Sequence, residues 1–268
     1  MNLQDRIGVG NLENLGLEDG LKWVVANGFH FADVCVDREL SLFPDKQVRM
    51  VRETCERHDI HLGLHTLSAV NIAETSPFLS EAVNQYLRAY IDLSKRLGCE
   101  WIVVHAGYHF KSDFAARQAA SLEHLKRAVE YAEKTGVLLL LENMNWEPDD
   151  AEIHYLGHNI KEFSYYFDAI SSQNFRWAFT INHAHLVPEG INGFLDAFGI
   201  DRCDEVRLAD NRGDKEQHLK IGEGTIDFVS LFRHIESAGY PGHYMLSLKL
   251  LEDMREGREY LLKLLGNN

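Results

Sequence analysis

Short apolar runs alternate with amphipathic stretches along almost the whole chain, and this alternation limits the fold more than any other feature. The runs are rich in Val, Ile, Leu and aromatic residues, as strands covered on both faces require. They lie at residues 7–10, 31–36, 60–65, 101–105, 137–142, 177–182, 205–208 and 244–249. Eight strands with helices between them predict either a closed parallel barrel or a doubly wound open sheet.

The stretches between the strands carry helix start and stop signals. In one of them Ser76 precedes Pro77, an order typical of an N-cap followed by the first helical residue, and Gly98 ends the stretch. Glycines end other stretches in the same way, because a glycine readily adopts the left-handed conformation that closes a helix. These signals predict helices over residues 17–27, 77–97, 115–134 and 228–238.

Two observations favour the closed barrel over the open sheet. No GxGxxG or GxxxxGK[ST] segment follows an early strand, so the phosphate-binding turn of the open fold is missing. Polar residues also recur where strand after strand ends, and the carboxyl ends of barrel strands meet at one mouth. These residues are His65, His105, Glu142, Asn182, His185, Asp210 and Lys249. With no linker in the sequence, we predict one α/β domain over residues 1–268, a single (β/α)8 TIM barrel.

Bulk composition limits the location and the partners. The longest apolar run, residues 137–141, is far shorter than the roughly 20 residues that span a bilayer, and the start MNLQDRIGVG has no apolar signal region. The four cysteines show no CxxC spacing, so we expect reduced thiols and a cytoplasmic protein without membrane contact. The formal net charge of −14 argues against a duplex nucleic-acid partner, which requires a basic face.

Several segments together resemble the xylose isomerase-like barrel superfamily, which includes sugar isomerases and epimerases, inosose dehydratase-type enzymes and abasic-site endonucleases. The resemblance covers nearly the whole chain and rests on GLHTLSAVN (63–71), GCEWIVVHAG (98–107), LLLENMNW (139–146), FTINHAHLV (179–187), VRLADNRGDKEQHLKIGEGTIDF (206–228) and LSLKLLED (246–253). The segment 206–228 is the most specific, with an Asp-Asn pair, an acidic-x-His and an Ile-Gly-Glu-Gly before a helix.

The resemblance implies metal ligands at several positions. One ion of the family takes histidines after the third and fourth strands and a glutamate of the fifth, which here are His65, His105 and Glu142. Two histidines and one carboxylate suit Zn, Mn or Fe with open coordination positions. A further ion of the endonucleases would correspond here to Asn182, His185, Glu216 and His218. The alternative for each set is a hydrogen-bonded polar cluster without metal, so we expect either one divalent ion or none.

The family's remaining ion has lost most of its ligands. It shares the fifth-strand glutamate and adds an Asp, a His and a Glu, at positions that here hold Asn182, Arg207 and Ser247. Asn carries no charge, Ser is a poor ligand, and Arg stays protonated and cannot ligate. We expect Arg207 to point inward and to replace the charge of that ion, pairing with Glu142 or with a substrate anion. The alternative is a salt bridge at the barrel mouth.

Other side chains at the mouth are candidates for substrate contact. Tyr108 and Trp146 follow strand ends, where an aromatic ring could stack on a sugar, whereas Trp177 starts a strand and is expected to pack. Lys249 is usual in the eighth-strand motif of the family and either binds substrate or pairs with an acidic neighbour. Cys35 is expected to be a core residue, because a reactive thiol needs a nearby cation. The full set of expected substrate-binding residues is Tyr108, Trp146, Asn182, Arg207, His218 and Lys249.

The leading functional hypothesis is an enzyme of the sugar isomerase or epimerase type. The resemblance implies proton abstraction next to a carbonyl of a sugar or sugar phosphate, with Glu142, His105 and Arg207 as the catalytic residues. Two alternatives remain open. One is a metal-dependent phosphodiesterase or abasic-site endonuclease, and the other is a metal-free barrel that binds a small anion through Arg207 and Lys249. A homo-oligomer is compatible with each of them.

Overall fold

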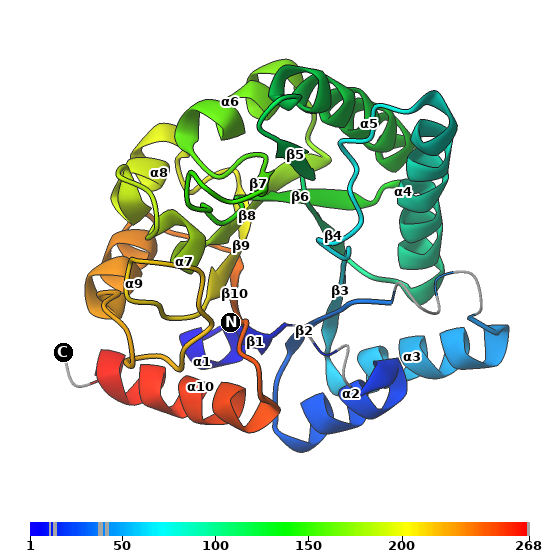
Figure 1. The fold of residues 1–268 in the computed structure, drawn as a ribbon. Helices are drawn as coiled ribbons and strands as arrows, with labels where there is room; N and C mark the ends of the chain where they lie inside the picture. Colours follow the sequence, from blue (N-terminus) through cyan, green and yellow to red (C-terminus); the bar gives the residue numbers. More distant parts are fainter. Residues whose placement is uncertain (11, 13–14, 37–39, 41–42, 267–268) are drawn as a thin grey trace.

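The structure, a computed structural model, describes residues 1–10, 12, 15–36, 40 and 43–266. Eight parallel strands in this part of the chain close into a barrel in the order β1-β10-β9-β8-β6-β4-β3-β2 (Figure 1). The closed order confirms the predicted barrel and excludes the open sheet. The strands are β1 (Ile7–Val9), β2 (Phe31–Val34), β3 (His61–His65), β4 (Trp101–Val104), β6 (Leu138–Glu142), β8 (Phe175–Thr180), β9 (Cys203–Leu208) and β10 (His243–Leu246).

Helices surround the strands as an outer ring (Figure 1). The predicted helix over residues 77–97 forms as expected, with Pro77 in its first turn and Gly98 in the left-handed conformation at φ 75°. The helices are α1 (Leu3–Arg6), α2 (Gly16–Ala26), α3 (Asp45–His58), α4 (Pro77–Leu97), α5 (Phe114–Thr135), α6 (Ile160–Ala169), α7 (Ile181–Ala184), α8 (Gly190–Phe198), α9 (Phe228–Ser237) and α10 (Leu251–Gly266).

Apolar side chains fill the lower part of the barrel interior. Trp101, Val103, Leu140, Ala178 and Met245 form a small buried cluster there. The Trp101 ring fits because β3 carries a glycine opposite it: a Cβ on that residue would lie 2.2 Å from the ring. A second, larger core lies between the strands and the helices. Because this part of the interior is packed, the active-site position expected for a barrel is the end at which the strands have their carboxyl ends.

A small two-stranded sheet lies beside the barrel mouth and was not predicted. Strand β5 (Tyr108–Phe110) follows β4, and β7 (Ile153–Tyr155) lies between β6 and α6. They pair antiparallel, with Tyr108 opposite Tyr155 and His109 opposite His154. No helix among the described residues is long and apolar enough to cross a membrane.

Candidate functional site

A cavity of about 370 Å³ opens at the carboxyl ends of the barrel strands, and its wall is predominantly polar. The side chains come from segments far apart in the sequence, because β3, β4, β6, β8 and β9 all end at this mouth. Two groups of ionisable residues dominate the wall. They are His65, His105 and Glu142, and His183, Glu216 and His218.

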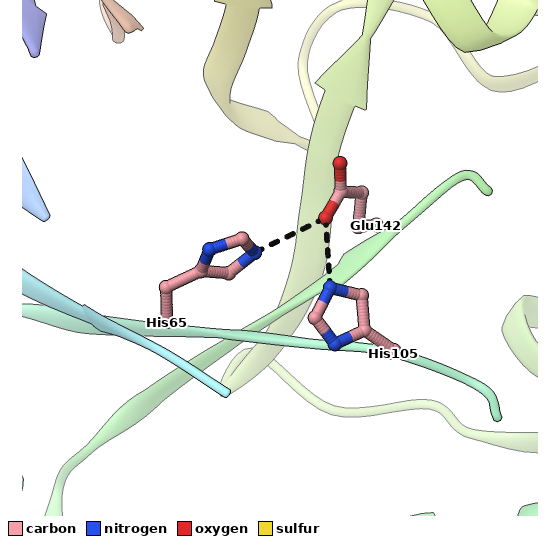
Figure 2. Close-up of side chains that lie close together, drawn as sticks. All are labelled: His65, His105 and Glu142. Atoms are coloured by element: carbon pink, nitrogen blue, oxygen red, sulfur yellow. Dashed lines mark hydrogen bonds and ion pairs between the residues drawn. The ribbon is translucent and has the colours of Figure 1, made fainter. Parts of the chain in front are cut away.

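The first group is built around one carboxylate oxygen. His65 ends β3, His105 follows β4, and Glu142 ends β6. Figure 2 shows both imidazoles turned toward the same oxygen of Glu142. The distances from Glu142 Oε2 are 3.2 Å to His65 Nε2 and 3.1 Å to His105 Nε2. The ligand atoms of the three residues therefore lie close enough together to share one ion.

Neighbouring residues hold this group in the orientation that a metal ligand needs. Thr66 Oγ1 lies 3.1 Å from His105 Nδ1 and donates to the carbonyl of Val103 at 3.1 Å. With the hydroxyl hydrogen on that carbonyl, Nδ1 of His105 donates to Thr66, and Nε2 presents a lone pair toward Glu142. A lone pair and a carboxylate at this distance repel each other unless a cation lies between them. Such a relay behind a ligating histidine is the usual support of a metal site, so the donor set fits a divalent ion.

Electrostatics keep His105 neutral and Glu142 charged. Burial lowers the pKa of His105, against the opposing effect of Glu142. Burial alone would raise the pKa of Glu142, but the adjacent imidazoles of His105 and His65 and the charge of Arg207 outweigh it and hold this pKa well below its usual value. Thr180 also donates a hydrogen bond to the other oxygen of Glu142. A neutral imidazole and an ionised carboxylate are the forms that bind metal.

The second group is organised in the same way around Glu216. His183 Nε2 lies 3.3 Å and His218 Nε2 3.0 Å from Glu216 Oε1. Each histidine donates its Nδ1–H to a backbone carbonyl, that of Asn143 for His183 and that of Ser247 for His218. Both histidines therefore point the opposite nitrogen toward the carboxylate, which repeats the supporting arrangement of the first group.

One oxygen of Glu216 and one of Asn182 are buried without a hydrogen-bond partner among the described residues. Asn182 donates its Nδ2–H to Glu216 Oε1 at 3.0 Å. Glu216 Oε2 and Asn182 Oδ1 are buried and have no hydrogen-bond partner among the described residues. A buried oxygen without a partner is costly, and a cation would satisfy it. The second group thus also fits a divalent ion.

Without an ion, the second group is an ion pair. Burial works against a charged His183, but Glu216 and Glu142 outweigh it and raise the pKa of His183 to about 9. Burial likewise opposes ionisation of Glu216, yet His183 and His218 lower its pKa to about 2. The site therefore holds a proton where a bound metal would otherwise provide the positive charge.

Arg207 lies on β9 and points into the barrel, where it contributes to the cavity wall although only 1% of its surface is exposed. It forms ion pairs with Asp33 of β2 and with Glu205 of β9, and its Nε lies 3.9 Å from Glu142 Oε1. Burial works against the charge, but these three carboxylates raise the pKa of Arg207 above its ordinary value. Its charge is thus balanced mainly by protein carboxylates.

Residues 21–264 match the family described as the xylose isomerase-like TIM barrel. The chain belongs to this family. An uncharacterised protein of Methanocaldococcus jannaschii is 26% identical over 270 residues, which cover 97% of this chain and 89% of that protein. A probable endonuclease 4 of Staphylococcus saprophyticus is 26% identical over 185 residues, which cover 64% of this chain and 60% of that protein.

Solved structures with the same fold include sugar epimerases. A D-tagatose 3-epimerase-like protein superposes with a TM-score of 0.83 at 23% identity, covering 98% of each chain. An L-ribulose 3-epimerase superposes with a TM-score of 0.77 at 15% identity, covering 98% of this chain and 95% of that one. At these identities the likeness shows the shared fold.

Within the family barrel, the structure corrects two sequence assignments. Asn182 was expected to end the sixth barrel strand, with His185 in the second ligand group. Strand β8 instead ends at Thr180, and the chain turns directly into α7. This turn places His183, three residues after Thr180, in the group with Glu216. His185 lies apart from it and contacts Thr225 Oγ1 at 2.9 Å.

Three other expected substrate-binding residues do not line this cavity. Tyr108 and Trp146 are absent from the wall of the 370 Å³ cavity, which Tyr155 lines instead. Lys249 lies beyond the end of β10 and is exposed, so it does not line this cavity either. Cys35, which we expected to be a core residue, lines the cavity wall, with its Sγ 3.9 Å from the Tyr90 hydroxyl.

Proposed function

We propose that this family member is a metal-dependent enzyme of the sugar isomerase or epimerase type, with its active site in the 370 Å³ cavity. One observation carries the proposal: His65 and His105 converge on a single buried oxygen of Glu142 at the cavity wall. A polar cavity of this size suits a small polyhydroxylated molecule. The fold shared with several sugar 3-epimerases supports the same substrate class.

In this proposal His65, His105 and Glu142 would hold a divalent ion, whose chemistry would be polarisation of a carbonyl or hydroxyl of the substrate. The charge of Arg207 helps to keep Glu142 ionised, so that Glu142 can ligate the ion or accept a proton at the cavity wall. His218, on the wall, is placed to donate or accept a hydrogen bond with a sugar hydroxyl. The four cysteines are free thiols, which suits the reducing cytoplasm that we infer.

Exchange of carbon-bound hydrogen tests the proposal directly. The protein is incubated with Mn²⁺ and with D-fructose, D-tagatose or D-psicose in D₂O, and deuterium next to the carbonyl is followed by NMR. We expect incorporation with at least one sugar, and a loss of about 100-fold or more in Glu142→Gln. The substitution removes both a ligand of the ion and a positioned proton acceptor, and the proton acceptor alone contributes about that factor. Glu152→Gln, which changes an exposed carboxylate outside the cavity, is the control. Metal-loaded protein that exchanges no sugar hydrogen would refute it.

A second candidate function is metal-dependent hydrolysis of a phosphoester. It is favoured by the second ligand group, since two ions in one cavity can clamp the attacking and leaving oxygens of a phosphoryl centre. The similarity to probable endonuclease 4 proteins supports it, while the net charge of −14 weighs against a duplex substrate. Cleavage of an abasic oligonucleotide, lost in Glu216→Gln, would establish this function in place of the first.

A further inference from the structure

A second cavity of about 380 Å³ lies beside the first one. The loop that follows β6 separates them: Met144 and Asn145 line the first cavity, and Trp146 lines the second. Glu147 lines both. Its Oε1 accepts a hydrogen bond of 2.6 Å from Asn145 Nδ2, which fixes the carboxylate between the two cavities. The Glu147 carboxylate is therefore part of the wall of both cavities.

The β5–β7 sheet contributes to both cavities through alternating side chains. Neighbouring residues of a strand point to opposite faces of a sheet. Tyr155 of β7 lines the first cavity, while His154 of β7 and its cross-strand partner His109 line the second. The two imidazoles stack with centroids 5.5 Å apart and planes 23° apart. This small sheet is thus a partition with one wall toward each cavity.

The second cavity offers hydrogen-bond acceptors and an aromatic surface. His109 donates Nδ1–H to the carbonyl of Phe110 at 3.0 Å, and His154 donates Nε2–H to that of Ala151 at 3.0 Å. In a neutral imidazole the other nitrogen then carries a lone pair. Neither of those nitrogens has a partner among the described residues. Together with the Trp146 ring, they match the hydroxyl groups and the apolar ring face of a sugar.

Charge in the second cavity favours a neutral ligand. The positive charge of Lys111 is outweighed by the negative charges of Glu147 and Asp149 on the same wall. His158 and Glu162 also line it, but they form an ion pair with each other at 3.4 Å. The remaining charge is negative, which disfavours a phosphate or carboxylate group at this position.

We propose that the second cavity is a subsite for a neutral sugar unit linked to the unit that reacts in the first cavity. The substrate is then a glycoside of at least two units, joined across Glu147, in place of a free monosaccharide. This inference rests on the proposed function for the position of the reacting unit. It adds Trp146, His109 and His154 as residues that determine specificity.

Binding of matched probes tests the subsite. Calorimetry compares D-fructose with the glucosyl-fructoses turanose, maltulose and isomaltulose, each with Mn²⁺-loaded protein. We expect at least one disaccharide to bind about tenfold or more tightly than D-fructose, a ratio that corresponds to about 1.4 kcal/mol. In His154→Ala and Trp146→Ala that ratio should fall toward one. Glu152→Ala, on the same segment but outside both cavities, should keep it.

The outcomes separate this inference from the proposed function. If the disaccharide preference depends on His154 and Trp146 but no sugar exchanges hydrogen, the subsite stands and the isomerase proposal fails. If D-fructose exchanges hydrogen and no disaccharide binds more tightly than it, the subsite is wrong and the isomerase proposal stands. A preference that survives both substitutions also overturns the subsite. Thermal unfolding of each variant confirms that it is folded.

Discussion

The Arg207 side chain is almost completely buried and lies within ion-pair distance of three carboxylates. Asp33 and Glu205 pair with it directly, and Glu142 lies 3.9 Å from its Nε. A buried charge is tolerated only when an opposite charge and hydrogen bonds compensate it. Arg207 therefore compensates the charge of two buried carboxylates, and it does so beside the Glu142 carboxylate of the first ligand group.

Removing this charge should destabilise the fold strongly. In Arg207→Met, Asp33 and Glu205 both lose the ion pair with Arg207, and Glu205 retains its contact with His243, 3.1 Å away. Breaking a buried ion pair from one side costs about 3–5 kcal/mol, so we expect a loss of this size in the free energy of unfolding, measured by urea denaturation.

A matched control removes an arginine that is partly exposed on the surface. Arg255 pairs with Glu252 and Glu259 on the surface of α10. Exposed pairs contribute about 0–1 kcal/mol, so Arg255→Met should be nearly neutral. Equal stability of the Arg207→Met and Arg255→Met variants would contradict the role given to Arg207.

The sequence reveals some residues of the site and hides others for a physical reason. His65, His105 and Glu142 are recognisable because each ends an apolar strand and the carboxyl ends of barrel strands converge. Asp33 and Glu205 lie within their strands, where a lone acidic residue gives no indication of its partner. The predicted ligand His185 is two residues away from the observed one, His183. The error arose because the sequence does not mark the turn from β8 into α7 at Thr180. Counting three residues from Thr180, the true end of β8, leads to His183.

Among the elements, α6 starts with a charged cap near the second cavity. Asn159 accepts a hydrogen bond from the backbone N–H of Glu162, and the Glu162 carboxylate accepts one from Gly157. His158 lies 3.4 Å from the same carboxylate. Burial opposes both charges, but Glu162 raises the pKa of His158, and His158 lowers the pKa of Glu162.

This cap should make stability depend on pH in a defined window. The contribution of His158 is complete below its unfolded pKa of about 6.5 and is lost as the pH rises through its raised folded value. That of Glu162 is complete above its unfolded pKa of about 4.3 and is lost as the pH falls through its lowered folded value. Glu162→Gln should therefore cost about 1 kcal/mol between these two pH values and less above them.

Urea denaturation of both proteins across pH 4 to 9 measures this difference. Lys161→Gln, on the exposed face of the same turn, serves as the control and should show no such window. If the loss in the free energy of unfolding in Glu162→Gln stayed constant up to pH 9, the prediction would be wrong. The effect would then come from the hydrogen bonds of the cap and not from the ion pair.

Element prediction succeeded where burial on both faces left a long apolar run. The eight barrel strands follow that pattern, and α4 carries clear signals at both ends. Strands β5 and β7 escaped notice because their three residues, Tyr-His-Phe and Ile-His-Tyr, have a histidine in the middle and therefore form no apolar run. Their pairing depends on contacts between distant segments, which no local pattern encodes. The partition between the two cavities could not be foreseen for that reason.

Over the whole molecule, closure of the barrel is what turns scattered residues into a site. The cavity is lined by side chains from segments far apart in the sequence, which meet because the strands close into a ring. They are residues 65, 105, 142, 183, 216 and 218. The convergence of polar strand ends was the feature that favoured the closed barrel over an open sheet, and the structure confirms that choice. The proposed metal chemistry depends on the same convergence.

Metal content per chain tests that chemistry most directly. The purified protein is incubated with Zn²⁺, Mn²⁺ or Fe²⁺, desalted and subjected to elemental analysis, with Glu142→Ala and His105→Ala as variants of the first group and His218→Ala as a variant of the second. We expect at least one ion per chain in the unmodified protein. Glu142→Ala and His105→Ala should each lose one ion that His218→Ala retains. A protein that holds no ion, or holds the same amount in all four forms, would contradict a metal site at His65, His105 and Glu142.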